Sequence, residues 1–372
     1  MTAAPPKAPR ERPPAPRVMF ASGDGRRSSN KSVDIVDMEE LDLDLDFPCK
    51  LAPNCAEEEE KEGVNIRPAF FSGSDESPSF DYVGGRDEAV GGAWEIEPED
   101  LALEGMVTAG AAADIFRGDF LGRTVAVKVY RRARAFNTMK QQVAFCREVD
   151  TLRELQHPNL VKLIGACMLA SPFRLVTEFC AGGNLHELLH ESGVELAWRQ
   201  RHEIARDIAQ AMTYLHSHDP QIIHRDLTSH NCLVASEVSG PADKVTVKVG
   251  NFGFARMRNR DEGRSSMTSD VGTLLWMAPE ILRREAYDGQ VDVYSFGIIL
   301  YELVFRRAPF DDLDECSFQR TVSCGGRPEV QDAPGECPGD MIGLMQECWK
   351  QEPAARPLFE NIAGSLSKQL EA

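Results

Sequence analysis

The spacing of hydrophobic residues becomes first strand-like and then helical as the chain proceeds beyond Trp94. Residues 125–130 and 174–179 are short runs rich in β-branched and aromatic residues, and the second run leads into an Ala-Gly-Gly turn. Between them, hydrophobic residues recur at every third position over 137–156, which predicts a helix. Later helical patterns cover 199–217, 290–305 and 339–350. The sequence therefore predicts an α+β fold with a strand-rich lobe followed by a larger helix-rich lobe.

The residues before Trp94 follow neither pattern. The first 98 residues hold 11 of the 22 prolines, and they carry 11 lysines and arginines against 21 acidic residues. Stretches such as PPKAPRERPPAP and EEEEKEG bury too little apolar surface to offset the entropy of an ordered chain. We therefore expect residues 1–94 to form a disordered, proline-rich and acidic tail. Residues 95–372 are expected to fold, with lobes at about 95–180 and 181–368.

One stretch of this tail differs from its surroundings. Residues 41–47, Leu-Asp-Leu-Asp-Leu-Asp-Phe, alternate apolar and acidic side chains with the period of a strand. This pattern suits a short motif that adds a strand to the sheet edge of a partner protein. The alternative is an acidic, solvated stretch whose alternation is accidental, and the sequence leaves both interpretations open.

Composition and charge exclude several classes of protein. The net charge of −18 opposes binding of nucleic acid or anionic membranes as a main function. The longest strongly apolar stretch, 294–305, is too short for a membrane span and contains Glu302, and the first residues lack the apolar core of a secretory signal. Ten cysteines occur without C-x-x-C spacing, which favours free thiols. We therefore expect a cytoplasmic protein, with the nucleus as the alternative.

Five separate signals carry candidate chemistry, in a fixed order. Lys128 closes a hydrophobic strand, and Glu148 lies in the helix that follows. Residues 224–231 match H-R-D-L-x-x-x-N, residues 251–253 read N-F-G where D-F-G is usual, and 278–280 supply A-P-E. Over about residues 95–368 the chain thus resembles the protein kinase superfamily, whose fold has a β-rich N-lobe and an α-rich C-lobe. Segments such as GTLLWMAPEIL and DVYSFGIILYEL are most similar to the tyrosine-kinase-like group, which consists mainly of serine/threonine kinases.

The resemblance implies ATP and Mg²⁺ as cofactors and a protein hydroxyl as acceptor. Phosphoryl transfer requires neutralised triphosphate charge and a hydroxyl held in line, with little covalent work by the protein. Lys128 would anchor the α- and β-phosphates, oriented by an ion pair with Glu148. Asp226 would accept or orient the proton of the attacking hydroxyl. Asn231 and Asn251 would be the metal ligands.

The resemblance also assigns a nucleotide pocket and several residues that hold the fold. Thr177 would be the gatekeeper, and residues 178–180 would form the hinge that binds the adenine edge. The residues expected at the nucleotide are Gly110, Ile115, Ala126, Lys128, Thr177, Glu178, Cys180 and Leu233. A stacked hydrophobic spine tied to Asp292 would contain Leu152, Leu163, His224 and Phe252. Glu280 and Arg356 would form a buried ion pair.

Two departures from the family pattern fall on the nucleotide and the metal. The glycine-rich loop G-x-G-x-x-G-x-V reads T-A-G-A-A-A-D-I here, so Gly110 is its one remaining glycine and Asp114 adds a negative charge. Asn251 replaces the aspartate that would bridge Mg²⁺ to the phosphates, which removes a full charge beside a divalent ion. In one interpretation Asn251 still ligates a metal held mostly by the phosphates. In the other, the chain is a pseudokinase that acts as a scaffold or allosteric partner.

The segment before A-P-E bears on substrate class and regulation. Residues 271–277 lack the proline typical of tyrosine kinases, which favours serine and threonine as acceptors. Ser266 and Thr268 are candidate phosphorylation sites, because a phosphate there could pair with Arg225 and order the segment. Thr273 is expected to shape the substrate site instead. The alternative is a mobile polar loop in which serine is simply common.

Overall fold

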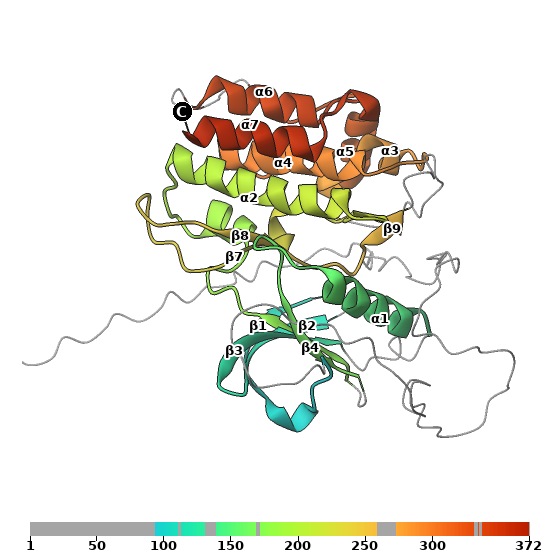
Figure 1. Ribbon diagram of the computed structural model, residues 1–372. Coiled ribbons are helices and arrows are strands. Elements are labelled where there is room, and N and C mark those ends of the chain that lie inside the picture. Colours follow the sequence, from blue (N-terminus) through green and yellow to red (C-terminus); the bar gives the residue numbers. More distant parts are fainter. Residues whose placement is uncertain are drawn as a thin grey trace, which may run out of the picture. The chain divides into compact units, whose positions relative to one another are not determined.

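A computed structural model describes residues 94–110, 113–130, 139–168, 172–258, 273–330, 334 and 337–371. Within these residues the chain forms a five-stranded sheet with one helix beside it, followed by a group of stacked helices (Figure 1). This is the bilobal α+β fold that the sequence predicts. The expected tail, apart from Trp94, and the alternating stretch 41–47 lie outside the described residues.

The strand-rich lobe is an antiparallel sheet in the order β1-β2-β3-β5-β4. Its strands are β1 (Leu101–Ala109), β2 (Ala113–Phe120), β3 (Arg123–Tyr130), β4 (Leu163–Cys167) and β5 (Arg174–Glu178). Helix α1 (Met139–Glu154) connects β3 to β4 and packs beside the sheet (Figure 1). The predicted strands at 125–130 and 174–179 and the predicted helix over 137–156 are therefore confirmed.

Strand β3 shows how the period of a strand separates the core from the candidate site. Val125 and Val127 are fully buried in a small core under the sheet. The intervening Ala126 and Lys128 point to the opposite face and remain half-buried. Lys128 therefore sits on the face that the helix-rich lobe approaches because of its odd-even position in the strand, not because of any local polarity.

The sheet is joined to the segment that precedes it by a close backbone contact. The amide of Ile96 donates to Ala166 O at 2.9 Å, and the amide of Ala166 donates to Trp94 O at 2.9 Å. A Cβ atom on the neighbouring Gly165 would press on Trp94 O and lie 2.7 Å from Ile96 Cδ1. Glycine at 165 is thus required by space.

Gly165→Ala is expected to lower the free energy of unfolding by about 1–3 kcal/mol, because the added methyl group forces the 94–96 segment off the sheet. The matched control is Gly105→Ala in β1, where a Cβ atom would meet nothing within 4 Å. Thermal unfolding of the two variants beside the parent chain measures the difference. Equal midpoints for both variants would contradict this interpretation of the contact.

The helix-rich lobe is built around a central buried helix. Its helices are α2 (Trp198–Ser217), α3 (Pro279–Leu282), α4 (Gln290–Phe305), α5 (Glu315–Ser323), α6 (Gly339–Cys348) and α7 (Phe359–Glu371). Every residue of α4 from 291 to 305 is buried, which matches a helix that is hydrophobic on all sides. Helices α2 and α7 pack together, and α6 packs on α4 (Figure 1). The predicted helices at 199–217, 290–305 and 339–350 are confirmed.

Two short strand pairs lie where the helix-rich lobe faces the sheet. Strand β6 (Gln221–Ile223) pairs with β9 (Arg256–Arg258), and β7 (Cys232–Val234) pairs with β8 (Val247–Val249), both antiparallel. The turn between β6 and β7 holds the H-R-D-L-x-x-x-N motif, and the turn between β8 and β9 holds Asn-Phe-Gly. These pairs therefore bring the two motifs side by side.

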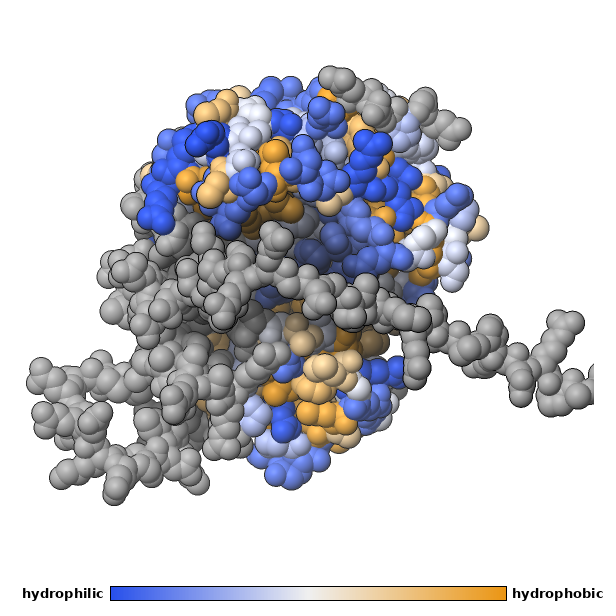
Figure 2. Space-filling model, turned by 180° about the vertical axis from the view of Figure 1, so that it is seen from behind, coloured by the Kyte–Doolittle hydropathy of each residue, from blue (hydrophilic) through white to orange (hydrophobic). Residues whose placement is uncertain are grey.

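The surface and the cysteines agree with the composition. Hydrophilic residues cover most of the described surface of the helix-rich lobe in Figure 2. In the other lobe, Leu103, Met106 and Val107 of β1 and Leu121 in the turn between β2 and β3 are exposed large hydrophobic residues. The eight described cysteines are free thiols. Within the described ranges, no helix is both long and apolar enough to cross a membrane.

Candidate active site

Lys128 and Glu148 meet between the sheet and α1. Lys128 Nζ lies 2.9 Å from Glu148 Oε1 and 3.1 Å from Oε2, so both carboxylate oxygens accept a hydrogen bond. The lysine side chain is 25% exposed and the glutamate side chain 3% exposed. The buried carboxylate thus fixes an ammonium group that still reaches solvent, which is the arrangement needed to bind an anionic ligand.

Tyr130 is a third member of this group that the sequence analysis did not identify. Its hydroxyl donates to Glu148 Oε2, and its ring lies 5.2 Å from Lys128 Nζ. Burial, followed by the neighbouring Glu148 carboxylate, raises the pKa of Tyr130 well above its ordinary value, so the hydroxyl remains a donor. The signal was present in the sequence, because positions 128 and 130 of one strand share a face.

A continuous series of hydrogen bonds runs from Lys128 to Asp226. Lys128 Nζ donates to Asn251 Oδ1 at 3.2 Å, and Asn251 Nδ2 donates to Asn231 Oδ1 at 3.0 Å. Asn231 Nδ2 then donates to Asp226 Oδ2 at 2.8 Å and to Asp226 O at 2.7 Å. The structure therefore brings together the three residues that the sequence places at the phosphates and the metal, and it joins them to Asp226, which the sequence places at the acceptor hydroxyl.

Lys128 and Asp226, at the two ends of this series of hydrogen bonds, determine how the side-chain amides of Asn251 and Asn231 are oriented. Lys128 can only donate, so the oxygen of Asn251 must face it, and the nitrogen of Asn251 must face Asn231. Asp226 presents oxygens that accept, so the nitrogen of Asn231 must face it and its oxygen must face Asn251. Neither amide can be flipped without placing two donors or two acceptors against each other.

This orientation bears directly on the expected metal site. Mg²⁺ binds oxygen ligands that converge on it. Here the oxygen of Asn231 accepts from the Asn251 amide nitrogen, and the oxygen of Asn251 accepts from Lys128. As arranged, the donor set does not fit a Mg²⁺ ion held between Asn231 and Asn251. An aspartate at 251 would place two acceptors against each other instead, and such a pair favours a cation between them.

Asp226 is held from a second side by Thr273, which lies five residues before the A-P-E motif. Thr273 donates to Asp226 Oδ1 from its amide at 2.9 Å and from its hydroxyl at 3.0 Å. Asp226 is nearly buried, and its two carboxylate oxygens point to Thr273 and Asn231 respectively. Thr273 therefore contacts the carboxylate that the sequence analysis assigns to the acceptor hydroxyl, and its role in shaping the substrate site stays a prediction.

The H-R-D turn is anchored to helix α4 through Asp292. Asp292 accepts from the amide of His224 at 2.9 Å, from the amide of Arg225 at 2.8 Å and from His216 Nε2 at 2.8 Å. Burial raises the pKa of Asp292, but the His216 hydrogen bond and its neighbours lower it by more, so the carboxylate is ionised. Arg225 is held at φ 65°, in the strained left-handed region. This anchor keeps Asp226 in place.

The residues of the expected spine pack in one hydrophobic core. The His224 and Phe252 rings lie 5.3 Å apart in an edge contact, and His224 Nε2 lies 3.0 Å from Gly250 O. Leu152 is buried in the same core, and Leu163 packs against it from β4. The contacts join α1, the sheet and the two motif turns.

The candidate nucleotide residues line the junction of the lobes. Ala126 pairs with Thr177 across β3 and β5, and Ile115 pairs with Lys128 across β2 and β3. Leu233 lies in β7 of the other lobe. All of these side chains are half-buried, and their contact with adenine stays a prediction.

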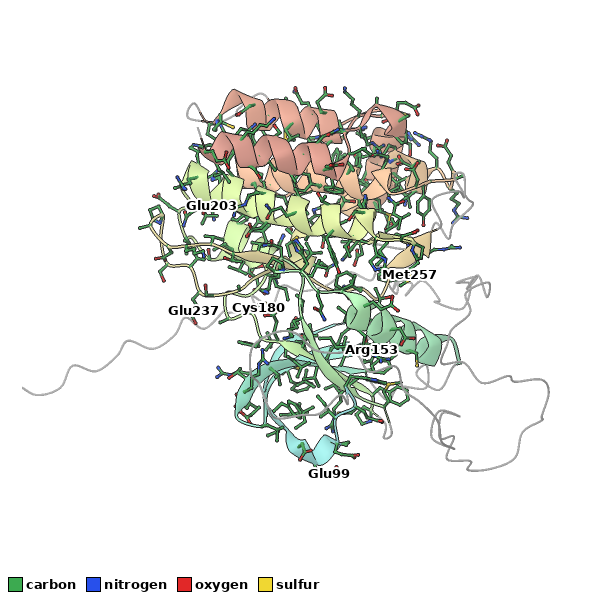
Figure 3. The ribbon with its side chains drawn as sticks, in the orientation of Figure 1. Glu99, Arg153, Cys180, Glu203, Glu237 and Met257 are labelled. Atoms are coloured by element: carbon green, nitrogen blue, oxygen red, sulfur yellow. The ribbon has the colours of Figure 1, made fainter. Side chains whose placement is uncertain are left out.

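The expected hinge, residues 178–180, begins at the last residue of β5. Cys180 lies where the chain passes from the sheet to the helix-rich lobe (Figure 3). The Glu178 side chain binds the Lys162 amide at 2.8 Å and Lys248 Nζ at 3.0 Å. Its carboxylate is therefore engaged within the protein, and the contact of residues 178–180 with adenine stays a prediction.

Other predicted site residues are only partly described. The amide of Gly110 donates to Ala113 O at 3.0 Å, while 111–112 of the glycine-poor loop lie outside the described residues. Arg225 Nε donates to Phe254 O at 2.6 Å and a terminal nitrogen donates to Tyr287 OH at 3.2 Å. Ser266 and Thr268 lie outside the described residues, so their pairing with Arg225 stays a prediction.

The expected ion pair between Glu280 of the A-P-E motif and Arg356 is buried. Arg356 donates to Glu280 Oε1 at 2.6 Å and to Oε2 at 2.9 Å in a bidentate pair. It also donates to Lys350 O and Gln290 O, both at 2.8 Å. The two side chains are 0% and 3% exposed. The pair thus ties the A-P-E segment to the start of α4 and to the chain before α7.

Comparison with known proteins gives the same family. A family described as protein tyrosine and serine/threonine kinase matches residues 101–366. The chain is 35% identical over 272 residues to "Probable serine/threonine-protein kinase drkD" of Dictyostelium discoideum and 36% identical over 279 residues to "Serine/threonine-protein kinase VIK" of Arabidopsis thaliana. These matches cover 72% and 74% of this chain but 20% and 62% of the relatives, so it spans less than two thirds of their length. The motifs, the fold and the match across residues 101–366 together show that the chain belongs to the protein tyrosine and serine/threonine kinase family.

Proposed function

We propose that residues 95–372 form a protein kinase domain that transfers phosphate from ATP to serine and threonine hydroxyls of proteins, within the tyrosine-kinase-like group. One observation carries the proposal: Lys128, paired with Glu148, is linked through two amides to Asp226. The proposed phosphate-binding group of one lobe and the candidate base of the other are thus joined by a continuous series of hydrogen bonds. The relatives named as serine/threonine kinases support the choice of acceptor.

In this proposal the residues act mainly by position and charge. Lys128 binds the α- and β-phosphates, while Glu148 and Tyr130 hold its ammonium group on the cleft side of β3. Asp226 orients the acceptor hydroxyl and takes its proton, and Thr273 keeps its carboxylate aligned. A metal ion that accompanies the nucleotide would neutralise phosphate charge.

A second candidate function is favoured by the amide of Asn251. Its amide nitrogen donates a hydrogen bond to the side-chain oxygen of Asn231. The oxygens of both expected metal ligands therefore have hydrogen-bond donors in place of an ion. A domain of this kind could bind ATP without a divalent cation and serve as a scaffold or allosteric partner. In both candidate functions the partner is a protein. We also propose that residues 41–47 form a short motif that adds a strand to the sheet edge of a partner protein.

Two measurements on the full chain separate the candidates. A thermal-shift titration with ATP is run with Mg²⁺, with Mn²⁺ and with a chelator, and radiolabelled phosphate transfer to a generic protein substrate is measured in parallel. Cation-dependent stabilisation with transfer supports the kinase. Stabilisation that is equal with the chelator, without transfer, supports the ATP-binding scaffold. Failure of ATP to stabilise the chain under any condition contradicts both.

Asn251→Asp is expected to raise Mg²⁺-dependent transfer, or the affinity for Mg²⁺-ATP, at least tenfold. The change removes the donor that faces Asn231 and adds a full charge, so the pair becomes a cation site, and tenfold corresponds to about 1.4 kcal/mol. Asn251→Ala is the control, because it breaks the same hydrogen bonds without supplying a ligand. If the aspartate variant changes neither quantity, the limiting defect lies elsewhere, most simply in the alanine-substituted loop.

The regulatory part of the proposal concerns the segment after Asn-Phe-Gly. We propose that phosphate on Ser266 or Thr268 pairs with Arg225, whose guanidinium already contacts Phe254 O and Tyr287 OH. Phosphopeptide mapping of the protein from resting and stimulated cells tests this idea. An unmodified segment in both states would count against it.

A further inference from the structure

A cluster of imidazoles around one buried carboxylate lies outside the candidate active site. His186 directly precedes the helical turn η4 (Glu187–Glu191), and His190 lies within it. Both face Glu302 of α4, which is completely buried. His230 stacks on His186 with ring centroids 4.0 Å apart. The cluster thus joins the segment after the hinge to the core of the helix-rich lobe.

Hydrogen bonding alone does not account for both histidines at this carboxylate. Glu302 Oε1 accepts from Ser229 Oγ at 2.8 Å, and Oε2 accepts from Trp276 Nε1 at 2.8 Å. His190 Nε2 lies 3.1 Å from Oε1. His186 Nδ1 lies 3.6 Å from Oε1 and 3.5 Å from Ser229 Oγ, both long for a hydrogen bond. Its nitrogen is therefore aimed at the carboxylate without a close contact.

We infer that His186, His190 and Glu302 bind a divalent transition-metal ion of the Zn²⁺ class. A set of two imidazole nitrogens and one carboxylate oxygen binds Zn²⁺ in preference to Mg²⁺ or Ca²⁺. Ligand atoms of a tetrahedral zinc site lie roughly 3.3–3.5 Å apart, given metal–ligand distances of about 2.0–2.2 Å. The three atoms here lie within 4.8 Å of one another, and the carboxylate is 3.1 and 3.6 Å from the two nitrogens.

The surroundings resemble the outer shell of a metal site. Trp276 fixes the far oxygen of Glu302 and Ser229 fixes the near one, so the ligand carboxylate is held in orientation. His186 and His190 are 20% and 13% exposed, so an ion can enter from solvent and keep water as a fourth ligand.

The test uses the full chain with accessible thiols alkylated under native conditions, because the exposed Cys316 and Cys324 could themselves bind zinc. Zn²⁺ is titrated by calorimetry, and Co²⁺ is titrated by its visible absorption, which reports tetrahedral coordination without thiolate. We expect one equivalent per chain. His186→Ala and His190→Ala should each lower the affinity at least tenfold, whereas His218→Ala, outside the cluster, should leave it within twofold.

The outcomes are separate from those of the kinase proposal, because metal binding is measured without nucleotide or substrate. Saturable binding that both cluster variants weaken supports the site. Absence of saturable Zn²⁺ and Co²⁺ binding in the parent chain would overturn it. So would binding that neither variant changes, since the ion would then be held by other residues.

Discussion

Asp226→Asn is expected to lower the rate of phosphoryl transfer about 100- to 10,000-fold, the range in which a positioned general base contributes. The substitution removes the proton acceptor and also replaces one carboxylate oxygen by a donor. That donor would face either Thr273 or Asn231, which now donate to the two oxygens. The loss should appear in kcat, because Asp226 is not among the residues proposed to bind the nucleotide. Initial rates at saturating ATP measure it.

The control for this variant is Asp312→Asn, at an exposed position, which should match the parent rate. ATP-dependent thermal stabilisation should be unchanged in Asp226→Asn, and this separates a lost base from a lost fold. Asp226→Asn and Asp312→Asn are also measured in the Asn251→Asp variant, whose higher expected transfer rate makes a large loss of rate easier to measure. Transfer that survives at the parent rate in Asp226→Asn would rule out the role assigned to this carboxylate.

Arg356→Met is expected to lower the free energy of unfolding by about 3–5 kcal/mol, because it leaves the Glu280 carboxylate buried and without its bidentate partner. For a domain of this size the thermal midpoint should fall by roughly 2–4 °C for each kcal/mol. Differential scanning fluorimetry and urea unfolding measure the shift independently. A loss below about 1 kcal/mol would show that the pair contributes no more than a surface ion pair.

Glu285→Gln provides the matched comparison. Glu285 pairs with Arg283 at 2.8 Å only two residues along the chain, but its side chain is 52% exposed. Removing that charge should cost about 0–1 kcal/mol. The double substitution of Glu280 and Arg356 by apolar residues should cost less than Arg356→Met alone, since no buried charge then remains unpaired.

The sequence predicted the elements well where periodicity was strong. Strand β3, helix α1 and the all-round hydrophobic α4 follow directly from residue spacing. The meeting of Lys128 with Glu148 follows from the family motif, and the structure places the two in contact. The order of the motifs thus located this pair, although the residues around Lys128 and Glu148 do not by themselves distinguish either one from an ordinary surface charge.

What the sequence did not reveal depends on contacts between distant residues. The substitution at 251 is plain from the motif, but the amide's orientation depends on Lys128, 123 residues earlier in the chain. The gathering of His186 and His190 at Glu302 likewise arises from packing across more than 110 residues. Tyr130 was within reach of strand periodicity, because it lies two residues after Lys128 in β3.

Three polar side chains of the buried helix α4 hold separate segments of the chain that lead to the candidate site. Asp292 binds the amides of the H-R-D turn, Ser295 donates to Trp276 O at 2.8 Å, and Glu302 accepts from Trp276 and Ser229. A loop secured in this way cannot open by itself while the helix stays folded. The amide protons of His224 and Arg225 should therefore exchange with solvent deuterium only at the rate of global unfolding of this lobe, although both residues lie in a turn.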